Sequence, residues 1–327
     1  MMKAVWYDKN GAADDVLVAG EIETPTPGPG EVLVRLHASG VNPSDVKARA
    51  GARPMGFPRI IPHSDGAGIV EAVGDRVDKG LVGQRVFLRN GQWGRASGTA
   101  AEYIAIDADY VHQLPQNIGF DCGAALGIPA LTAAHAVLKD GNVEGSTILI
   151  HGGGGTVGRL AVQIATKSGA KVITTTGRDD QIDALYALGA AAVFDYRDPD
   201  LAAQILSSND GHPVQRVIDG EIGMNLGSSI EVVETKGHIV GYGSALHPNP
   251  ELPFLGLMFK NITLSGILVY LLESDEAQKY AEIITRLLHN GDLNVPIANR
   301  FDLSEAALAH KAVEAGQRHG AVVLQIT

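Results

Sequence analysis

Cysteine, aromatic side chains and long apolar runs are all scarce in this chain. The single cysteine, Cys122, cannot form an internal disulfide, and a structural zinc lobe needs several cysteines or histidines together. The longest apolar runs, such as ILVYLL at 267–272, are far too short to span a bilayer. The opening residues MMKAVWYDKN lack the apolar core of a signal peptide. We therefore expect a cytoplasmic protein.

Positive charge is also in short supply. The 327 residues include 37 acidic and 26 basic side chains, which gives a net charge of -11. An acidic surface repels nucleic acid and anionic membranes, so neither is expected as a partner. The composition is otherwise globular, and the length suits two domains.

The first part of the chain has the pattern of short strands separated by turns. Alternating apolar stretches lie at 32–41, 66–77, 84–88 and 100–106, and the first is expected to break at Gly40. Short strands at this spacing predict a barrel-like or sandwich domain.

After Pro129 the pattern changes to strands that alternate with helices. Strands are predicted at 146–152, 171–176, 191–196, 214–220 and 237–243, and helices between them include 179–189, 200–208 and 224–235. The strands begin about every 20 to 25 residues, the period of a βαβ unit. We predict an α/β fold with a doubly wound parallel sheet covered by helices on both faces.

A run of glycines, HGGGGTVG at 151–158, follows the first strand of this half and opens a helix. Gly153, Gly155 and Gly158 fit G-x-G-x-x-G, and Thr156 and Val157 begin the helix. The first glycine is expected to allow a tight turn, the second a close approach to a pyrophosphate and the third close helix packing. The sequence therefore predicts a dinucleotide at this helix N-terminus. The glycines at 65–68 lack this context and are expected to serve turns and packing.

The tip of the second strand of this half indicates which dinucleotide binds. It ends in small hydroxyl residues up to Thr176, followed by Arg178, with no carboxylate for a ribose 2′-hydroxyl. Arg178 is suited to a 2′-phosphate, which favours NADPH. Asp179 and Asp180 are expected to cap the next helix. The alternative, that Arg178 is a solvated loop charge, stays open.

Several motifs together resemble the zinc-free quinone oxidoreductase (zeta-crystallin-like) family of the medium-chain dehydrogenase/reductase superfamily. They are GVNPSDVKARAG (40–51), HSDGAGIVEAVGDRV (63–77), GTAAEYIAI (98–106), AALGIPALTAAHAV (124–137), ILIHGGGGTVG (148–158) and FDYRDPD (194–200). The resemblance implies a GroES-like β-barrel-type catalytic domain formed by 1–124 plus 269–327, a Rossmann dinucleotide-binding domain at 125–268, and NADPH-dependent reduction of a quinone.

The resemblance also implies positions around the cofactor. Asn42 would lie beside the nicotinamide, and Tyr196 would contact the adenosine 2′-phosphate. The other cofactor positions that it implies are Pro129, Thr132, Gly241, Gly243 and Leu268, the last in a predicted strand at 261–270 that would also border the substrate. Each of these also has a purely structural interpretation, in capping or packing.

Zinc-dependent members of the superfamily carry a cysteine before a Ser/Thr-Asp pair and a later Gly-His-Glu. Here Asn42 stands at the cysteine position and Ser64-Asp65 at the His-Glu position, while His63 is one residue off. Oxygen and amide ligands alone make a poor zinc site, so no metal is expected.

One departure from the family concerns the substrate. Lys47 and Arg53 occupy places where the family often has tyrosines, and with Arg49 they form a basic stretch. Three interpretations stay open. The stretch could bind an acidic or phosphorylated substrate, it could attract the negatively charged cofactor, or it could be a solvated charged loop.

The expected mechanism is hydride transfer from NADPH to a quinone or an enone. Charge that develops on the acceptor's oxygen would be stabilised by the Asn42 amide, by Lys47 or by water held by Asp45. Asp45 is more simply expected to anchor its loop. The alternatives are a reductase of α,β-unsaturated carbonyls (enone, alkenal or enoyl thioester) and a non-catalytic NADPH-binding structural or RNA-binding protein. A homodimer is expected through the 261–270 strand at the sheet edge.

Overall fold

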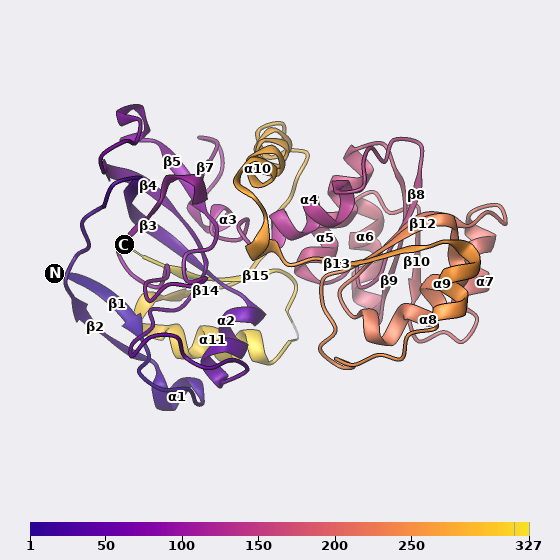
Figure 1. The fold of residues 1–327 in the computed structure, drawn as a ribbon, viewed down its shortest axis with the longest axis horizontal. Coiled ribbons are helices and arrows are strands. Elements are labelled where there is room, and N and C mark those ends of the chain that lie inside the picture. The colour runs from indigo at the N-terminus through magenta and orange to yellow at the C-terminus, as the bar shows by residue number, and fades with distance from the viewer. Residues whose placement is uncertain (317, 327) are drawn as a thin grey trace. The chain divides into compact units, whose positions relative to one another are not determined.

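The computed structural model describes residues 1–316 and 318–326, and the chain forms two compact units. Unit 1 comprises Met1–Leu131, Tyr270–Gly291 and Val295–Thr327, and unit 2 comprises Thr132–Val269 and Asp292–Asn294 (Figure 1). The chain thus leaves unit 1, builds unit 2 and returns. No helix within the described residues combines the length and the apolar character needed to cross a membrane.

Unit 2 is built on a six-stranded parallel sheet in the order β10-β9-β8-β11-β12-β13. Numbered within the unit this is 3-2-1-4-5-6, the order of a dinucleotide-binding Rossmann sheet. The strands are β8 Thr147–Ile150, β9 Lys171–Thr176, β10 Ala192–Asp195, β11 Val214–Asp219, β12 Val233–Gly241 and β13 Thr263–Gly266. The predicted doubly wound α/β fold is confirmed.

Helices cross over between these strands. They are α5 Thr156–Lys167, α6 Ile182–Ala187, α7 Leu201–Ser208, α8 Ile222–Val232 and α9 Phe254–Lys260, and α4 Pro129–Leu138 leads into the unit. The central strands carry buried apolar side chains because both faces of a parallel sheet are covered. Leu149, Ile173, Val217 and Ile239 accordingly have no exposed surface.

Unit 1 contains a seven-stranded sheet in the order β14-β15-β3-β4-β5-β7, with β6 also paired to β3, and a separate β1-β2 hairpin. Its strands are β1 Met2–Trp6, β2 Val18–Ile22, β3 Glu31–Val41, β4 Asp65–Val73, β5 Arg85–Leu88, β6 Tyr103–Asp107, β7 Val111–Gln113, β14 Ile297–Asp302 and β15 Ala321–Gln325. Its helices are α1 Ala13–Val16, α2 Pro43–Ala50, α3 Phe120–Gly123, α10 Ser274–His289 and α11 Ala306–Glu314. Short 3-10 segments are η1 Lys79–Leu81, η2 Ala108–Tyr110, η4 Val269–Leu271 and η5 Leu303–Glu305, with η3 Asp179–Gln181 in unit 2.

The structure corrects several predicted boundaries. Strand β3 does not break at Gly40, where the bare Cα lets the strand pass against the Ala124 carbonyl. The glycines at 66 and 68 lie inside β4 rather than in a turn, and Gly68 packs against the Arg35 carbonyl.

Helix α8 ends at Val232 instead of reaching 235, because the β-branched, buried Val233 already starts β12. The predicted 261–270 strand shortens to β13, so Leu268 lies beyond it, just before η4.

Candidate active site

In unit 2 the glycine run forms a tight turn between β8 and α5. Gly152 adopts φ +69°, a conformation that residues with a Cβ rarely take, and its N–H lies 3.1 Å from the Thr175 hydroxyl. The tight turn was predicted at Gly153, and the positive φ lies one residue earlier. Gly153 is needed for a different reason, since a Cβ there would overlap the Thr174 hydroxyl.

The remaining glycines of the motif differ in the space around the Cα, where a Cβ would lie. A Cβ on Gly158 would overlap the Gly152 carbonyl, so this glycine packs the helix against the turn. Gly155, the N-cap of α5, faces open space, because its Cβ would meet only the Gly152 oxygen at 3.4 Å. The N–H groups of Thr156 and Val157 begin the helix and have no intrahelical acceptor. Backbone donors with no side chain in front of them suit a phosphate group.

The carboxyl ends of β9 and β10 bring together the residues predicted for the adenosine end. Thr176 is paired in register with Asp195, and the Tyr196 ring covers Gly177. The Thr176 hydroxyl lies 2.7 Å from Gln181 Oε1. Tyr196 is half exposed, so its ring offers a free surface at this edge.

Two arginines lie at this edge, and the sequence analysis selected only one. Arg178 is held by Asp180 at 2.8 Å, so this aspartate does not cap the next helix as expected; it pairs with the arginine. Arg197 forms an ion pair with Asp195 at 2.6 Å and stacks over Tyr196. Its position in FDYRD, one residue after the selected tyrosine, was the available signal.

The other positions implied in the second half lie in α4, at and after the end of β12, and just before η4. Pro129 and Thr132 are buried in the first turn of α4, where Pro129 needs no N–H partner. Gly241 ends β12, and Gly243 lies close to the Gly220 carbonyl. Leu268 is 46% exposed. Like the glycine turn, Gly241 and Gly243 follow the carboxyl end of a parallel strand, which is where such sheets bind ligands.

In unit 1, Asn42 lies in a buried polar network at the start of α2. Its backbone N–H donates to Asp45 Oδ2 at 2.8 Å in a capping box, so Asp45 anchors this helix as expected. Its side-chain Nδ2 donates to Asp65 Oδ2 at 2.9 Å. The same oxygen accepts the N–H of Ile128 at 3.0 Å, immediately before α4. Asp65 therefore connects the N-termini of α2 and α4.

Burial governs the protonation of both carboxyl groups. Desolvation raises the pKa of Asp45 to about 7, although the Asn42 N–H and the positive charge of Arg53 oppose the shift. Desolvation also raises the pKa of Asp65 well above its usual value, and the nearby Asp45 adds to the effect. Burial thus favours the neutral form of Asp65, which lies next to the Asn42 amide.

The three basic residues of the predicted stretch have different environments. Lys47 is exposed on α2. Arg49 is 1% exposed and binds the Gly11 carbonyl and Glu314, so it is structural and does not belong to a basic surface. Arg53 is partly exposed, with its guanidinium 5.0 Å from the centre of the Trp93 ring.

The positions that hold zinc in related enzymes do not suit a metal here. Asn42 and Asp65 are hydrogen-bonded to each other, and the atoms that they could offer to a metal ion are oxygens, which make a poor zinc site. His63 turns away, with Nδ1 2.9 Å from the Ser39 hydroxyl and Nε2 2.9 Å from His310 Nε2. Within residues 1–316 and 318–326, no three His, Cys, Asp or Glu residues gather as a metal site would require.

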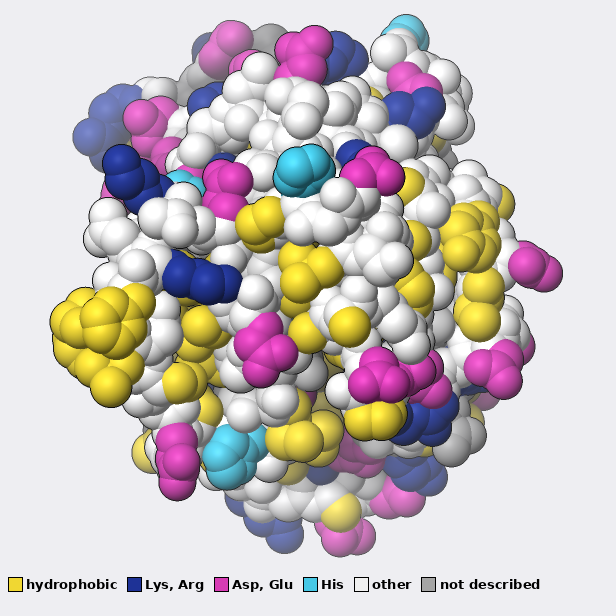
Figure 2. All heavy atoms as spheres, turned by 90° about the vertical axis from the view of Figure 1, so that its right-hand side faces the viewer, with side chains coloured by type: hydrophobic (Ala, Val, Ile, Leu, Met, Phe, Trp, Pro, Cys, Tyr) yellow, Lys and Arg dark blue, Asp and Glu magenta, His cyan; other side chains and the backbone are white. Residues whose placement is uncertain are grey.

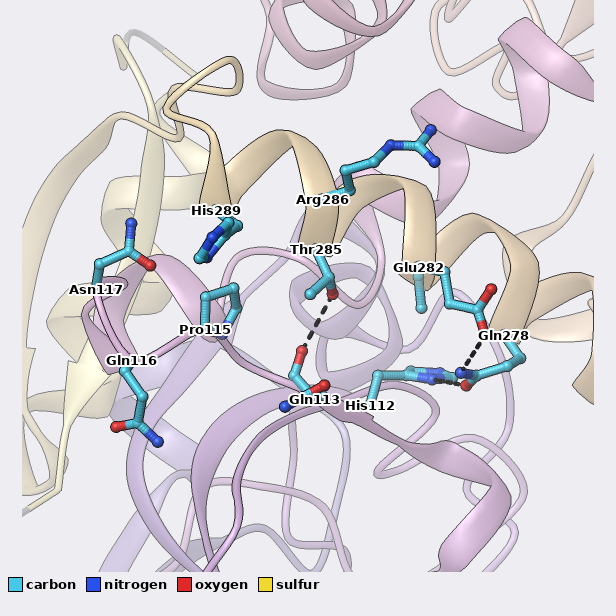
Figure 3. A pocket seen from close by; sticks show the side chains of 11 residues that line it. His112, Gln113, Pro115, Gln116, Asn117, Gln278, Glu282, Thr285, Arg286 and His289 are labelled. Carbon is cyan, nitrogen blue, oxygen red and sulfur yellow. Dashed lines mark hydrogen bonds between the residues drawn. The ribbon is translucent and has the colours of Figure 1, made fainter.

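A separate pocket of about 650 Å³ lies in unit 1 between α10 and the segment around β7 (Figure 3). His112 Nδ1 lies 3.1 Å from Gln278 Oε1, and Thr285 donates to the Gln113 carbonyl, so these contacts tie the helix to the strand. None of the predicted site residues lines this pocket.

Comparison with known proteins adds to this geometry. Residues 28–116 match the alcohol dehydrogenase GroES-like domain, and residues 156–286 match the zinc-binding dehydrogenase family. The quinone oxidoreductase of Sus scrofa is 32% identical over 319 residues, which cover 96% of this chain and 94% of that protein. The chain belongs to the quinone oxidoreductase family.

Solved structures of quinone oxidoreductases have the same fold throughout. A mycobacterial quinone oxidoreductase aligns with a TM-score of 0.91 at 27% identity and full coverage of both chains. The Escherichia coli quinone oxidoreductase, solved in complex with NADPH, aligns with a TM-score of 0.86 at 26% identity, covering 99% of this chain and 100% of that one. The resemblance seen in the sequence, to this family and to the GroES-like and Rossmann folds, is confirmed.

Proposed function

We propose that this member of the quinone oxidoreductase family is an NADPH-dependent quinone oxidoreductase that works without a metal ion. The observation that carries the proposal is the open Gly155 at the N-terminus of α5, set in a sheet of order 3-2-1-4-5-6. The E. coli relative complexed with NADPH supports the choice of cofactor.

The pyrophosphate is assigned to the turn of Gly153, Gly155 and Gly158 and to the N–H groups of Thr156 and Val157. The 2′-phosphate is assigned to Thr176, Arg178 and Tyr196, with Arg197 as a fourth contact. Two guanidinium groups at one strand edge suit a doubly charged phosphate better than a neutral ribose. Their carboxylate partners, Asp180 and Asp195, form exposed ion pairs with them, which are weak enough for a phosphate to compete.

The nicotinamide end is assigned to Asn42, Pro129, Thr132, Gly241, Gly243 and Leu268. Bound NADPH would supply a hydride to an electrophilic carbon of the quinone. Within the described residues, Asn42 uses one of its two amide hydrogens, toward Asp65. The second can donate to the acceptor's oxygen as negative charge develops there.

Two further residues complete the assignment near the substrate. Lys47 is exposed and adds positive charge on the same helix. Asp45 is engaged in the capping box, so we assign it to holding Asn42 in position. Conjugation in a quinone spreads the developing charge, which makes a metal ion less necessary.

A substrate panel with both nicotinamides, run after chelator treatment, tests this function. We expect NADPH-dependent reduction of 1,4-naphthoquinone at the highest kcat/KM, with slower reduction of an alkenal and of crotonyl-coenzyme A. Faster reduction of the alkenal or thioester would assign the enzyme to α,β-unsaturated carbonyls instead. Loss of all activity on chelation would refute the metal-free mechanism.

We also propose a homodimer formed through β13. This strand is the last in the order of the sheet, and among the described strands only β12 pairs with it. The neighbouring α9 exposes Phe254, Leu255 and Phe259, the last at 78%. Figure 2 views a face of the molecule on which hydrophobic side chains gather in patches. Light scattering should give a dimer that Leu264→Lys weakens and that Leu308→Lys, an exposed leucine of unit 1, leaves intact.

A further inference from the structure

A small pocket of unit 1 is lined in part by Arg53, one of the residues predicted to bind the substrate. Its volume is about 340 Å³, and its walls include Tyr7, Arg53, Met55, Phe57 and Trp93. That volume is near the lower end of the range for small-molecule sites, about 300 to 1,000 Å³. A compact ligand of one or two fused rings suits it better than an extended one.

The aromatic wall of this pocket is held in place by contacts behind it. Trp93 stacks on Tyr270, with ring centres 4.3 Å apart and planes inclined by 10°. Tyr270 in turn donates its hydroxyl to Ser44 Oγ at 2.9 Å, on helix α2. Trp93 is partly exposed, and with Phe57 it gives the pocket a fixed aromatic wall that favours an aromatic ligand, because the site needs little reorganisation.

The cation in the pocket, Arg53, differs from its neighbours in its ion pairing. Three arginines lie close together in this part of the sequence, and two are paired: Arg49 with Glu314 and Arg59 with Asp8. Arg53 takes part in none of the ion pairs formed among the described residues. It donates one long hydrogen bond, 3.4 Å, to Gln92 Oε1.

One carboxyl group does sense the charge of Arg53. That group is Asp45, whose pKa burial raises to about 7 while Arg53 lowers it. Its oxygen is already engaged with the Asn42 N–H, so it is at most a partial counter-charge. Arg53 thus keeps donors available in a pocket with aromatic walls.

We propose that this pocket selects planar aromatic acceptors that carry an anionic substituent, such as a carboxylate or sulfonate, with Arg53 binding the anion and Trp93 the ring. This inference rests on the proposed quinone reductase function and names its substrate class. An arginine over an aromatic ring can bind a carboxylate or sulfonate through two parallel N–H donors while the ring system stacks beside it.

Comparing 1,4-naphthoquinone with its 2-sulfonate tests the proposal in the full-length protein with NADPH. The measured quantity is the ratio of kcat/KM for the sulfonate to that for the neutral quinone, which removes differences common to both. Arg53→Met, which keeps the stem and removes the charge, should lower this ratio about tenfold, mainly through KM. Arg53→Lys should lower it less, and Arg59→Met, the matched arginine outside the pocket, should not change it.

A binding measurement separates this proposal from the proposed function. Naphthalene-2-sulfonate cannot be reduced, and its affinity can be compared with that of 2-naphthol by calorimetry, whether or not any quinone is turned over. We expect tighter binding of the sulfonate, weakened by Arg53→Met and by added salt. An unchanged ratio and unchanged sulfonate affinity in Arg53→Met would overturn the proposal. No turnover of either quinone, with charge-dependent binding intact, would refute the reductase function and leave the pocket supported.

Discussion

Asp65 Oδ2 lies 2.9 Å from Asn42 Nδ2, and both side chains are buried. Because the same oxygen also accepts the Ile128 N–H, one carboxyl group fixes the amide and the start of α4. The amide's orientation is thereby set before any ligand binds, with one hydrogen left for an acceptor.

Substitution of Asp65 tests this positioning role. Burial favours the neutral carboxyl group, so Asp65→Asn keeps an uncharged oxygen for both donors, whereas Asp65→Ala leaves them unpaired. We expect Asp65→Ala to lower kcat at least tenfold more than Asp65→Asn does, with little change in the KM for NADPH. Equal losses in the two variants, measured by steady-state kinetics, would argue against positioning through the hydrogen bond.

A pair of glycine substitutions tests the pyrophosphate assignment. Gly155→Ala has ordinary backbone angles and open space, so the fold should lose less than about 1 kcal/mol. Its methyl group would nevertheless stand where the phosphate is expected, and the Kd for NADPH should rise at least tenfold. Gly158→Ala should instead lower Tm, because its Cβ meets backbone. Unaltered NADPH affinity in a folded Gly155→Ala would mean that the phosphates bind elsewhere.

Arg178 and Arg197 should determine the preference for NADPH over NADH. A hydrogen bond to a charged group is worth about 1.5 to 3 kcal/mol, so each arginine-to-alanine change should raise the KM for NADPH about 10- to 100-fold. NADH lacks the 2′-phosphate, so its KM should change less than about threefold. Similar losses with both cofactors would assign these arginines to structure, through their pairs with Asp180 and Asp195.

Asp45 should make unit 1 less stable as the pH rises. Its pKa is about 7 in the folded protein against 3.8 as a reference, so the unfolded chain ionises first on raising the pH. The resulting loss is absent below pH 4, grows between pH 4 and 7 and then levels off, reaching up to about 4 kcal/mol. Asp45→Asn should therefore gain stability relative to the parent protein over this interval.

Urea unfolding followed by tryptophan fluorescence measures this effect, because Trp6 and Trp93 both lie in unit 1. Asp8→Asn is the matched control, since the Asp8 carboxylate is exposed and its hydrogen bond to Arg59 lowers its pKa. That control should show no gain between pH 5 and 8. A constant stability difference between Asp45→Asn and the parent protein across this range would contradict the raised pKa.

The local pattern predicted the parts of this fold that depend on short stretches of sequence. The parallel strands and the glycine turn follow from apolar runs and from motif context. Among four consecutive glycines, however, any one can take a positive φ, and only the fit to Thr174 and Thr175 places it at Gly152. The periodicity of the sequence does not distinguish these four glycines.

Residues whose role depends on distant partners were harder to predict. Arg49 belongs to a basic stretch in the sequence, yet Glu314, 265 positions away, gives it a buried partner. Trp93 and Tyr270 carry no motif and meet only in the folded unit. The substrate pocket was therefore invisible in the sequence, although Arg53 on its wall was selected.

The order of the strands in unit 1 has a consequence for synthesis on the ribosome. Strand β15 lies between β14 and β3, so the early strand β3 obtains this neighbour only when residues 321–325 have been made. Almost all of unit 2 is one continuous stretch, Thr132–Val269, and can form on the nascent chain first. Residues 1–131 must then wait, with the edge of β3 uncovered, until residues 321–325 have been made.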